Sequence, residues 1–433
     1  MDTVLLSRWQ FGITTLFHFL FVPLTIGLST IVAVFEVLYW LSKKPVYDKA
    51  ARFWFKLQVV IFTVGVASGI ALEFQFGTNW SEYSRFVGDV FGPPLAAEVI
   101  FTFFLESTFF GLLIFGRDKI SSRMRAFSAT MVSLGAIMSA FWILAANSWQ
   151  QTPAGYQIKG GRAILVDFSA AIFNPSTFPR FWHTLDGAFM TAAFFVIGIS
   201  AYFLLKGRSA DLANVSMRVG LIFALTATLF MLVTGDIHAK QVAETQPVKL
   251  AAFEGLWKTQ PRAPLMLVGI PLPSEEQNIL EIIAPGFLSL LAYGDIDAPV
   301  RGLDDFPKDQ WPPVSVCFFS FHLMIIIWSF LAILVLFAFF FRKKLASKRM
   351  FLKVLILSIP LPFLANELGW IVAEMGRQPW VVYGILLTYQ AASPLPWWYV
   401  LLTVSAITLL YVSLLFLVIH LLKREISKAV TNG

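Results

Sequence analysis

The feature that most constrains this chain is a series of apolar runs, each long enough to cross a lipid bilayer. A hydrocarbon core of about 30 Å requires about 20 mainly apolar residues in an α-helix. Only 14% of the 433 residues are charged, whereas about a quarter are charged in soluble proteins. We therefore predict an all-α integral membrane protein with about nine transmembrane helices, near residues 11–40, 53–76, 94–116, 126–150, 181–205, 217–236, 315–341, 351–375 and 397–421.

Lysine and arginine are distributed unevenly among the connections between these runs. The connections after the first, third, fifth and seventh runs, and the C-terminal tail, are rich in basic residues. The connections 77–93 and 376–396 hold one basic residue each, Arg85 and Arg377. Short basic connections remain in the cytoplasm, so we expect the N-terminus outside and the C-terminus in the cytoplasm. The net charge of +7 then reflects topology, and we do not expect nucleic-acid binding.

The chain divides into three parts: helices one to six in 1–236, a long connection in 237–314, and helices seven to nine in 315–433. The long connection is rich in Pro, Gly, Gln and charged residues, and its length is typical of a functional loop. The predicted orientation places it outside the cytoplasm. The single cysteine, Cys317, excludes a disulfide within the chain, a thiolate-bound iron–sulfur cluster and a covalently attached c-type haem.

Ionisable side chains occur within the apolar runs, where a charge costs from ~3 to more than 10 kcal/mol. Helix direction and a rise of about 1.5 Å per residue place five candidate site residues in the outer half of the membrane: His18, Glu98, His183, Met324 and Glu374. Imidazole and thioether groups bind haem iron, and a carboxylate is a harder ligand that can leave a coordination site open for oxygen. The alternative for each polar residue alone is a hydrogen bond to a neighbouring helix, and for the methionine a gap-filling role. We assign no role to His238, at the start of the predicted loop, and expect His420 at the cytoplasmic interface.

Four local strings together resemble subunit I of the cytochrome bd quinol oxidases, over nearly the whole chain. The first is Trp-x-x-x-Glu-x-Gly-Arg-Gln-Pro-Trp at 370–380, and the second is Lys-Leu-Ala-Ala-Phe-Glu at 249–254. The third is Phe-Leu-Glu-Ser-Thr-Phe at 104–109, and the fourth is Arg-Trp-Gln-Phe-Gly-x-Thr-x-x-Phe-His at 8–18. Their combination with about nine helices is far more specific than any one string alone.

The resemblance implies three non-covalent haems. His183 and Met324 would bind the low-spin haem b558. His18 and Glu374 would each hold one haem of the high-spin pair, b595 and d, and the resemblance leaves open which residue binds which haem. It also leaves open whether a b haem takes the place of haem d.

The resemblance also implies roles for residues around the haems. Glu98 would lie beside the high-spin pair, Trp370 would transfer electrons between haems, and Arg377 would pair with haem propionates. Glu106, with Ser107 and Ser139, would belong to a proton path from the cytoplasm. Lys249 and Glu254 would bind and deprotonate quinol in the outer loop.

The implied protein is a terminal respiratory oxidase of a bacterial or archaeal cytoplasmic membrane. It would oxidise quinol at the outer face and reduce oxygen to water with protons taken from the cytoplasm. Its implied partner is subunit II of the oxidase, together with lipid, and the resemblance also allows small single-helix subunits. Ubiquinol and menaquinol both remain open as the substrate.

Two departures from the family pattern and two rival classes of protein bear on this interpretation. Histidine stands at 322 where the family pattern has arginine, and the outer loop is short after Glu254. A transporter would show internal repeats and broken helices, and a di-haem cytochrome b anchor would supply paired histidines. A haem–copper oxidase is excluded because its haems and copper need more than the five histidines present.

Overall fold

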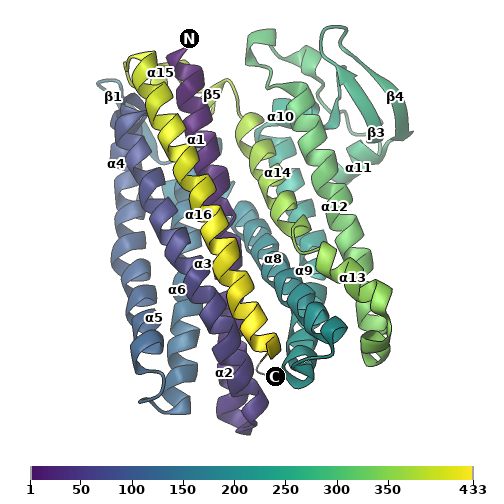
Figure 1. Ribbon diagram of the computed structural model, residues 1–433. Coiled ribbons are helices and arrows are strands. Elements are labelled where there is room, and N and C mark those ends of the chain that lie inside the picture. The colour runs from purple at the N-terminus through teal and green to yellow at the C-terminus, as the bar shows by residue number, and fades with distance from the viewer. Residues whose placement is uncertain (1, 432–433) are drawn as a thin grey trace.

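The structure is a computed structural model that describes residues 2–431. Figure 1 shows long helices standing side by side, with the two chain ends at opposite ends of the bundle. The described residues contain 9 helical segments that are long and apolar enough to span a membrane. The predicted fold class is therefore confirmed. The segments are Thr3–Ser42, Pro45–Thr78, Ser81–Gly116, Ser122–Gln151, Phe168–Lys206, Ala210–Thr245, Val314–Phe340, Arg349–Met375 and Trp397–Thr431.

Several helices extend well beyond the apolar runs that predict them. Helix α3 spans Pro45–Thr78, and α9 spans Ala210–Thr245, although apolar residues predict only 53–76 and 217–236. The polar residues at these ends continue the backbone hydrogen bonding, which a hydropathy pattern does not detect. As a consequence His238 lies inside α9 and not in the long loop.

The first membrane segment is divided into α1 (Thr3–Phe19) and α2 (Val22–Ser42). Pro23 lies in the first turn of α2. Its ring lacks an N–H and clashes with the carbonyl group four residues earlier, so the helix breaks after Phe19, one residue beyond His18. Gly27 then allows α2 to pack closely on α8 (Thr177–Lys206), because a Cβ atom at this position would lie 2.5 Å from the Ala188 carbonyl oxygen.

The third membrane segment changes its helical winding at Glu98. It consists of α4 (Ser81–Ala97), a π-helix, η1 (Glu98–Phe103), and α5 (Phe104–Gly116). Pro93 and Pro94 lie inside α4, where they remove backbone donors. π-Helical turns inside α-helices are frequent at functional sites, and this one begins at a predicted site residue.

Helix α8, whose middle turns are almost entirely buried, packs against α2, α6 (Ser122–Gln151), α9, α13 (Arg349–Leu357) and α14 (Leu361–Met375). Helix α12 (Val314–Phe340) packs against α9 and α14, and α16 (Trp397–Thr431) packs mainly against α1 and α3. Pro360 lies between α13 and α14, and Pro362 lies in the first turn of α14. Helix α16 returns beside α1, where the ring of Tyr411 stacks on Phe17 at 4.2 Å between centroids.

The long loop forms a small layer over the end of the bundle that carries the N-terminus (Figure 1). It contains α10 (Pro247–Glu254), the antiparallel strands β3 (Leu265–Leu272) and β4 (Gln277–Ala284), α11 (Phe287–Tyr293) and the short 3-10 turns η2 (Leu303–Asp305) and η3 (Lys308–Gln310). The other short elements are β1 (Tyr156–Lys159), β2 (Arg162–Leu165), α7 (Phe168–Ile172), η4 (Arg342–Ser347), β5 (Trp380–Val382), β6 (Leu386–Leu387) and α15 (Thr388–Ala391).

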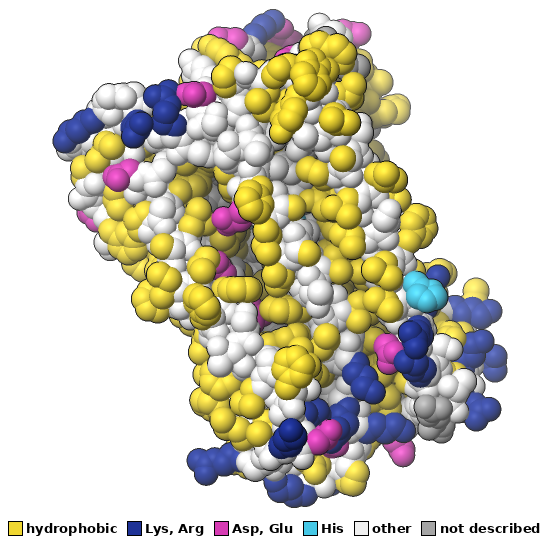
Figure 2. All heavy atoms as spheres, turned by 60° about the vertical axis from the view of Figure 1, so that its left-hand side comes forward, with side chains coloured by type: hydrophobic (Ala, Val, Ile, Leu, Met, Phe, Trp, Pro, Cys, Tyr) yellow, Lys and Arg dark blue, Asp and Glu magenta, His cyan; other side chains and the backbone are white. Residues whose placement is uncertain are grey.

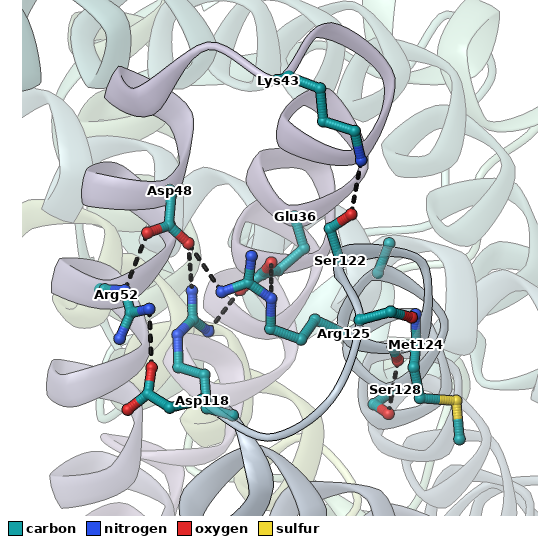
Figure 3. Close-up of polar contacts among 12 residues, drawn as sticks. Glu36, Lys43, Asp48, Arg52, Asp118, Ser122, Met124, Arg125 and Ser128 are labelled. Atoms are coloured by element: carbon teal, nitrogen blue, oxygen red, sulfur yellow. Dashed lines mark hydrogen bonds and ion pairs between the residues drawn. The ribbon is translucent and has the colours of Figure 1, made fainter.

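A buried ionic network ties helices together at the opposite end, which carries the C-terminus. Glu36 of α2 is fully buried and pairs with Arg117 and Arg125. Asp48 of α3 accepts from Arg125 at 2.8 Å and from Arg52 at 2.9 Å (Figure 3). Lys and Arg side chains are densest at this end in Figure 2, and apolar side chains dominate the surface between the two ends.

Candidate functional site

The last turn of α14 brings Glu374 into a polar layer beneath the long loop. The Glu374 Oε1 atom accepts a hydrogen bond from Asn147 Nδ2 at 3.3 Å, and its Oε2 atom pairs with Arg377. Asn147 in turn accepts a hydrogen bond from Arg180. The layer therefore joins the ends of α6, α8 and α14, which are far apart in the sequence.

Lys249 enters the same layer from the long loop. Its Nζ atom donates to Gln151 Oε1 at 2.7 Å, and its aliphatic stem lies against Gly376. A Cβ atom on Gly376 would lie 2.5 Å from the Val372 carbonyl oxygen and 2.8 Å from Lys249 Cγ, so both the last turn of α14 and the lysine stem approach this glycine closely. Two of the strings singled out in the sequence are thus in direct contact.

The layer contains more buried positive charge than negative charge. Arg180, Arg377 and Lys249 are 6%, 3% and 4% exposed, and the carboxylate of the layer, Glu374, pairs directly with Arg377 alone among these three. Among the described residues, the Nε and Nη1 atoms of Arg377 have no hydrogen-bond partner. Burial, followed by the charges of Arg180 and Arg377, lowers the pKa of Lys249 well below its usual range. Buried charges require partners, so this layer fits an anionic group.

His18, at the end of α1, faces two small residues of α3. Its Nδ1 atom lies 3.0 Å from Ser68 Oγ. A Cβ atom on Gly69 would lie 3.0 Å from His18 Cε1, so the glycine makes room for the imidazole ring. The hydrogen bond orients the ring through Nδ1, which leaves Nε2 as the nitrogen available to a metal.

His183 and Met324 lie on α8 and α12, and each contacts a glycine of a further helix. The closest approach of a Cβ on Gly235 to the His183 ring would be 3.9 Å, and a Cβ on Gly369 would lie 3.2 Å from Met324 Sδ. Among the described residues, His183 Nδ1 is buried without a hydrogen-bond partner. The ring of His238 lies 5.3 Å from the His183 ring, and the sequence pattern gave no reason to place it there.

Trp370 lies one turn before Glu374 on α14 and contacts two other parts of the site. Its ring meets Phe19 edge-on at 5.1 Å between centroids. The Arg180 guanidinium group lies over the ring at 5.8 Å. Phe19 directly follows His18, so a continuous series of aromatic and polar contacts runs from the His18 region to Glu374.

Glu98, Ser139 and Glu106 lie along the contact between α6 and the third membrane segment. Ser139 donates to Glu98 Oε1 at 2.7 Å. Glu106 is 5% exposed, and its backbone lies against Gly135, where a Cβ would come 3.2 Å from Glu106 Cα. Glu106 Oε1 has no hydrogen-bond partner among the described residues. Helix α6 therefore contacts Glu98 through Ser139 and Glu106 through Gly135. Ser139 and Gly135 are four residues apart on this helix.

Glu254 ends α10 and is buried, with 5% of its surface exposed. Burial raises the pKa of this carboxyl group to about 8. Its Oε2 atom has no hydrogen-bond partner among the described residues. A buried carboxyl group with a pKa close to neutrality is suited to exchanging a proton with a bound substrate.

His322, at the position where the family pattern has arginine, connects α12 to the long loop. Its Nε2 atom lies 2.9 Å from the Met266 carbonyl oxygen of β3, and its Nδ1 atom lies 2.9 Å from the Phe318 carbonyl oxygen. The ring also stacks on Phe318 at 3.9 Å between centroids. In this structure His322 therefore holds the β3–β4 hairpin against α12.

Arg180, Asn147, Gln151 and His238 are site residues that the sequence interpretation missed. Arg180 lies just outside the predicted helix, yet it precedes His183 by three residues and therefore shares its face of α8. That spacing is the one signal in the sequence that points to it. The two amides lie in the last turns of α6, where polar residues are also expected at a membrane surface.

Comparisons with known proteins agree with this fold. Residues 6–430 match the family model described as cytochrome bd terminal oxidase subunit I. The chain is 43% identical to cytochrome bd ubiquinol oxidase subunit 1 of Bacillus subtilis (strain 168), over 99% of this chain and 94% of the relative. It is 36% identical to cytochrome bd-II ubiquinol oxidase subunit 1 of Escherichia coli (strain K12), over 98% of this chain and 96% of the relative.

A solved structure of similar fold is the bd oxidase from Geobacillus thermodenitrificans. Its TM-score is 0.93 at 30% identity, and the match covers 99% of each chain. The fold and the comparisons together define a multi-pass membrane subunit of a respiratory oxidoreductase. The chain belongs to the cytochrome bd terminal oxidase subunit I family, which confirms the resemblance drawn from the four strings. This family implies haem cofactors and a subunit II partner.

The residues present fit haem. Each haem carries propionate carboxylates, which match the excess of buried positive charge at Arg180, Arg377 and Lys249. The imidazole and thioether groups of His18, His183 and Met324 suit haem iron. The glycines Gly69, Gly235 and Gly369 contact these three side chains. Because glycine has no side chain, a neighbouring helix can approach each ligand closely and still leave space beside it.

Proposed function

We propose that this chain is the haem- and quinol-binding subunit of a terminal oxidase that oxidises quinol at the outer membrane face. The observation that carries the proposal is the direct contact of Lys249, from the long loop, with Gly376 beside Glu374 and Arg377. This contact sets a quinol-binding loop against the residues that would hold haem propionates.

The proposed orientation follows from the charge distribution. The end with the C-terminus carries the dense basic residues and the buried network of Glu36, Asp48 and their arginines. Basic connections are retained in the cytoplasm, so the long loop and the N-terminus face outward. A bacterial or archaeal cytoplasmic membrane fits this arrangement, since the similar relatives are bacterial.

His183 and Met324 would hold haem b558, and His18 and Glu374 would each hold one of the high-spin haems b595 and d, or a b haem in place of d. The chemistry that bound haems supply is one-electron transfer and oxygen binding. The chain orients the ligands: Ser68 bonds to His18, and Asn147 bonds to Glu374. Trp370, in contact with Phe19 and Arg180, would provide an aromatic route between haems.

The quinol side depends on Lys249 and Glu254, which are both buried in α10. Glu254 would accept a quinol proton as the carboxylate and release it outside. Lys249 would hydrogen-bond a quinol oxygen. Exposed Leu267, Val268 and Ile282 on the β3–β4 hairpin give the loop an apolar surface that suits the delivery of a lipid-soluble substrate. One similar chain is named a ubiquinol oxidase subunit and another a putative menaquinol oxidase subunit, and the site residues favour neither quinone.

The proton side depends on the third membrane segment. Glu106 would take up protons from the cytoplasmic side and pass them toward Glu98, with Ser139 and Thr102 as hydroxyl groups beside the second carboxylate. A carboxylate held in the membrane is suited to proton relay.

The test is a haem count on the purified two-subunit complex, combined with quinol-dependent oxygen consumption. We expect three haems per copy of this chain, and oxygen consumption that stops when Glu254 is replaced by alanine while all three haems remain. Fewer than three haems would contradict the ligand assignment. Unchanged quinol turnover in Glu254→Ala would place the quinol site elsewhere.

A further inference from the structure

A cleft of about 250 Å³ opens at the end of the bundle that carries the C-terminus. It lies between the first turns of α3, the start of α9 and the end of α16. The haem and quinol sites proposed above lie in and beneath the long loop, at the other end of the bundle. The residues that line the cleft are Lys49, Arg52, Phe53, Lys56, Leu212, Glu425, Lys428 and Ala429.

Three cations form a stripe along one wall of this cleft. Lys49, Arg52 and Lys56 are spaced by three and four residues, which places them on one face of α3. Like charges at this spacing repel each other. The stripe is therefore unfavourable unless negative charge approaches it.

The negative charge within the chain does not balance the stripe. Arg52 is paired with Asp48 at 2.9 Å and with Asp118 at 2.8 Å (Figure 3). These two carboxylates and Glu36 balance the charges of Arg52, Arg117 and Arg125. The network therefore has no further carboxylate that could pair with the two lysines of the stripe.

Across the cleft, Glu425 is paired with Lys428. Among the described residues, Lys49 and Lys56 form no salt bridge, and both side chains are exposed. Two ammonium groups on the cleft wall are therefore left without a counter-charge.

The floor of the cleft is apolar, and a hydrogen bond between two of the helix ends fixes its position. Phe53 and Leu212 are 8% and 1% exposed and form its floor with Ala429. Ser209 donates to the Ala429 carbonyl oxygen at 2.7 Å, which fixes the end of α16 against the start of α9. A ligand that satisfies the whole cleft must combine an anionic group with apolar chains.

We propose that this cleft binds an anionic phospholipid, with the phosphodiester group at Lys49 and Lys56 and the glycerol and upper acyl chains over Phe53 and Leu212. Basic pockets between membrane helices on the cytoplasmic side bind such headgroups. The lysine stems lie along the apolar floor while their ammonium groups reach the phosphate. The inference rests on the membrane setting of the family and on none of the haem or quinol assignments.

The test uses the purified two-subunit complex, stripped of lipid in a neutral detergent and titrated with phosphatidylglycerol or phosphatidylcholine. Bound lipid is counted by native mass spectrometry. The double variant Lys49→Gln/Lys56→Gln should bind phosphatidylglycerol at least tenfold more weakly than the wild type. The matched control, Lys343→Gln/Lys344→Gln, removes two exposed cations from the same end of the bundle and should bind it as the wild type does. Phosphatidylcholine should bind weakly to all three proteins.

Three results would overturn the proposal. Equal phosphatidylglycerol binding by the cleft variant and the control would show that the cleft is not the site. Displacement of the lipid by millimolar inorganic phosphate would show a free-anion site. Carboxyl-directed cross-linking of Lys49 or Lys56 to subunit II, with no bound phosphatidylglycerol, would show that an acidic segment of the partner fills the cleft.

Discussion

The aliphatic stem of Lys249 lies against Gly376, so closely that a Cβ atom on the glycine would come within 2.8 Å of Lys249 Cγ and 3.0 Å of Cε. This contact joins the loop helix α10 to the end of α14. It makes the position of one proposed quinol residue depend on a backbone that also carries Glu374 and Arg377.

Gly376→Ala should therefore displace both Lys249 and the last turn of α14, where the added Cβ would also lie 2.5 Å from the Val372 carbonyl oxygen, without removing any proposed ligand. Because a misplacement of about 1 Å can cost about 10²-fold in rate, we expect a fall of that order in quinol oxidation with haem content retained. Oxygen consumption and optical spectra measure the two effects. The control is Gly111→Ala on α5, where an added Cβ meets nothing within 4 Å. Wild-type turnover in Gly376→Ala would show that the contact has no role in the reaction.

Met324→Leu should convert the low-spin haem to a high-spin form or release it. Leucine keeps the volume and apolarity of methionine, so the fold should survive, while the sulfur ligand is lost. Optical spectra and redox titration report the change. Met190→Leu, at a methionine that is 3% exposed on α8, is the matched control. An unchanged low-spin spectrum in Met324→Leu would assign Met324 to core packing alone.

The rate of quinol oxidation should depend on pH through Glu254. Because burial raises the pKa of Glu254 to about 8, the group is protonated below that pH and becomes a carboxylate as the pH rises through it. A base acts in its deprotonated form, so kcat/KM for quinol should rise about tenfold per pH unit below the pKa and level off above it. Glu254→Gln should be nearly inactive and flat over the same range. A wild-type profile that falls between pH 6 and 8 would contradict the role.

Glu106→Gln tests the proton route. Glutamine fills the same space but cannot take up and release a proton, so oxygen consumption should fall by about 10²-fold or more. Reduction of the low-spin haem by quinol should remain fast, because the loop is unchanged. Ser133→Ala is a control for polar substitution on the α6 face, since it removes a 2.8 Å contact with Thr30. If Glu106→Gln consumes oxygen at the wild-type rate, the relay does not pass through this residue.

Glu36→Ala should destabilise the bundle strongly. It removes the fully buried partner of Arg117 and Arg125, which keep only the partly exposed Asp48, so the cost should approach about 3–5 kcal/mol, the cost of breaking a buried ion pair. Glu82→Ala removes an exposed pair with Arg85 and should cost at most about 1 kcal/mol. Thermal unfolding of the complex in detergent compares the two. Equal unfolding midpoints would show that the network does not stabilise the helix ends.

The fold class could be predicted from the sequence because bilayer thickness sets a minimum length that apolar runs reveal directly. The ends of the helices could not be predicted from the sequence, because polar residues extend a helix beyond the bilayer without any hydropathy signal. The largest consequence concerns α9, which continues to Thr245 and carries His238 to the side of His183. The break after His18 could have been expected from Pro23, whose effect on the preceding turn is local.

The individual residues of the candidate site could be predicted from the four sequence strings and from the free-energy cost of placing a charged side chain in a membrane. Their mutual contacts could not be predicted. The bond from Lys249 to Gln151 and the position of Arg180 over Trp370 join parts of the chain far apart in sequence, and only tertiary packing brings them together. The roles of these residues remain predictions until the variants above are measured.

The most direct measurement of the central proposal is the optical spectrum of the purified two-subunit complex before and after anaerobic addition of quinol. After quinol is added, we predict the absorption bands of a reduced low-spin b haem and of a reduced high-spin haem pair. Both sets of bands should disappear when oxygen is admitted. Absence of haem bands, or haem bands that do not respond to quinol, would contradict the proposal that this chain carries electrons from quinol to oxygen.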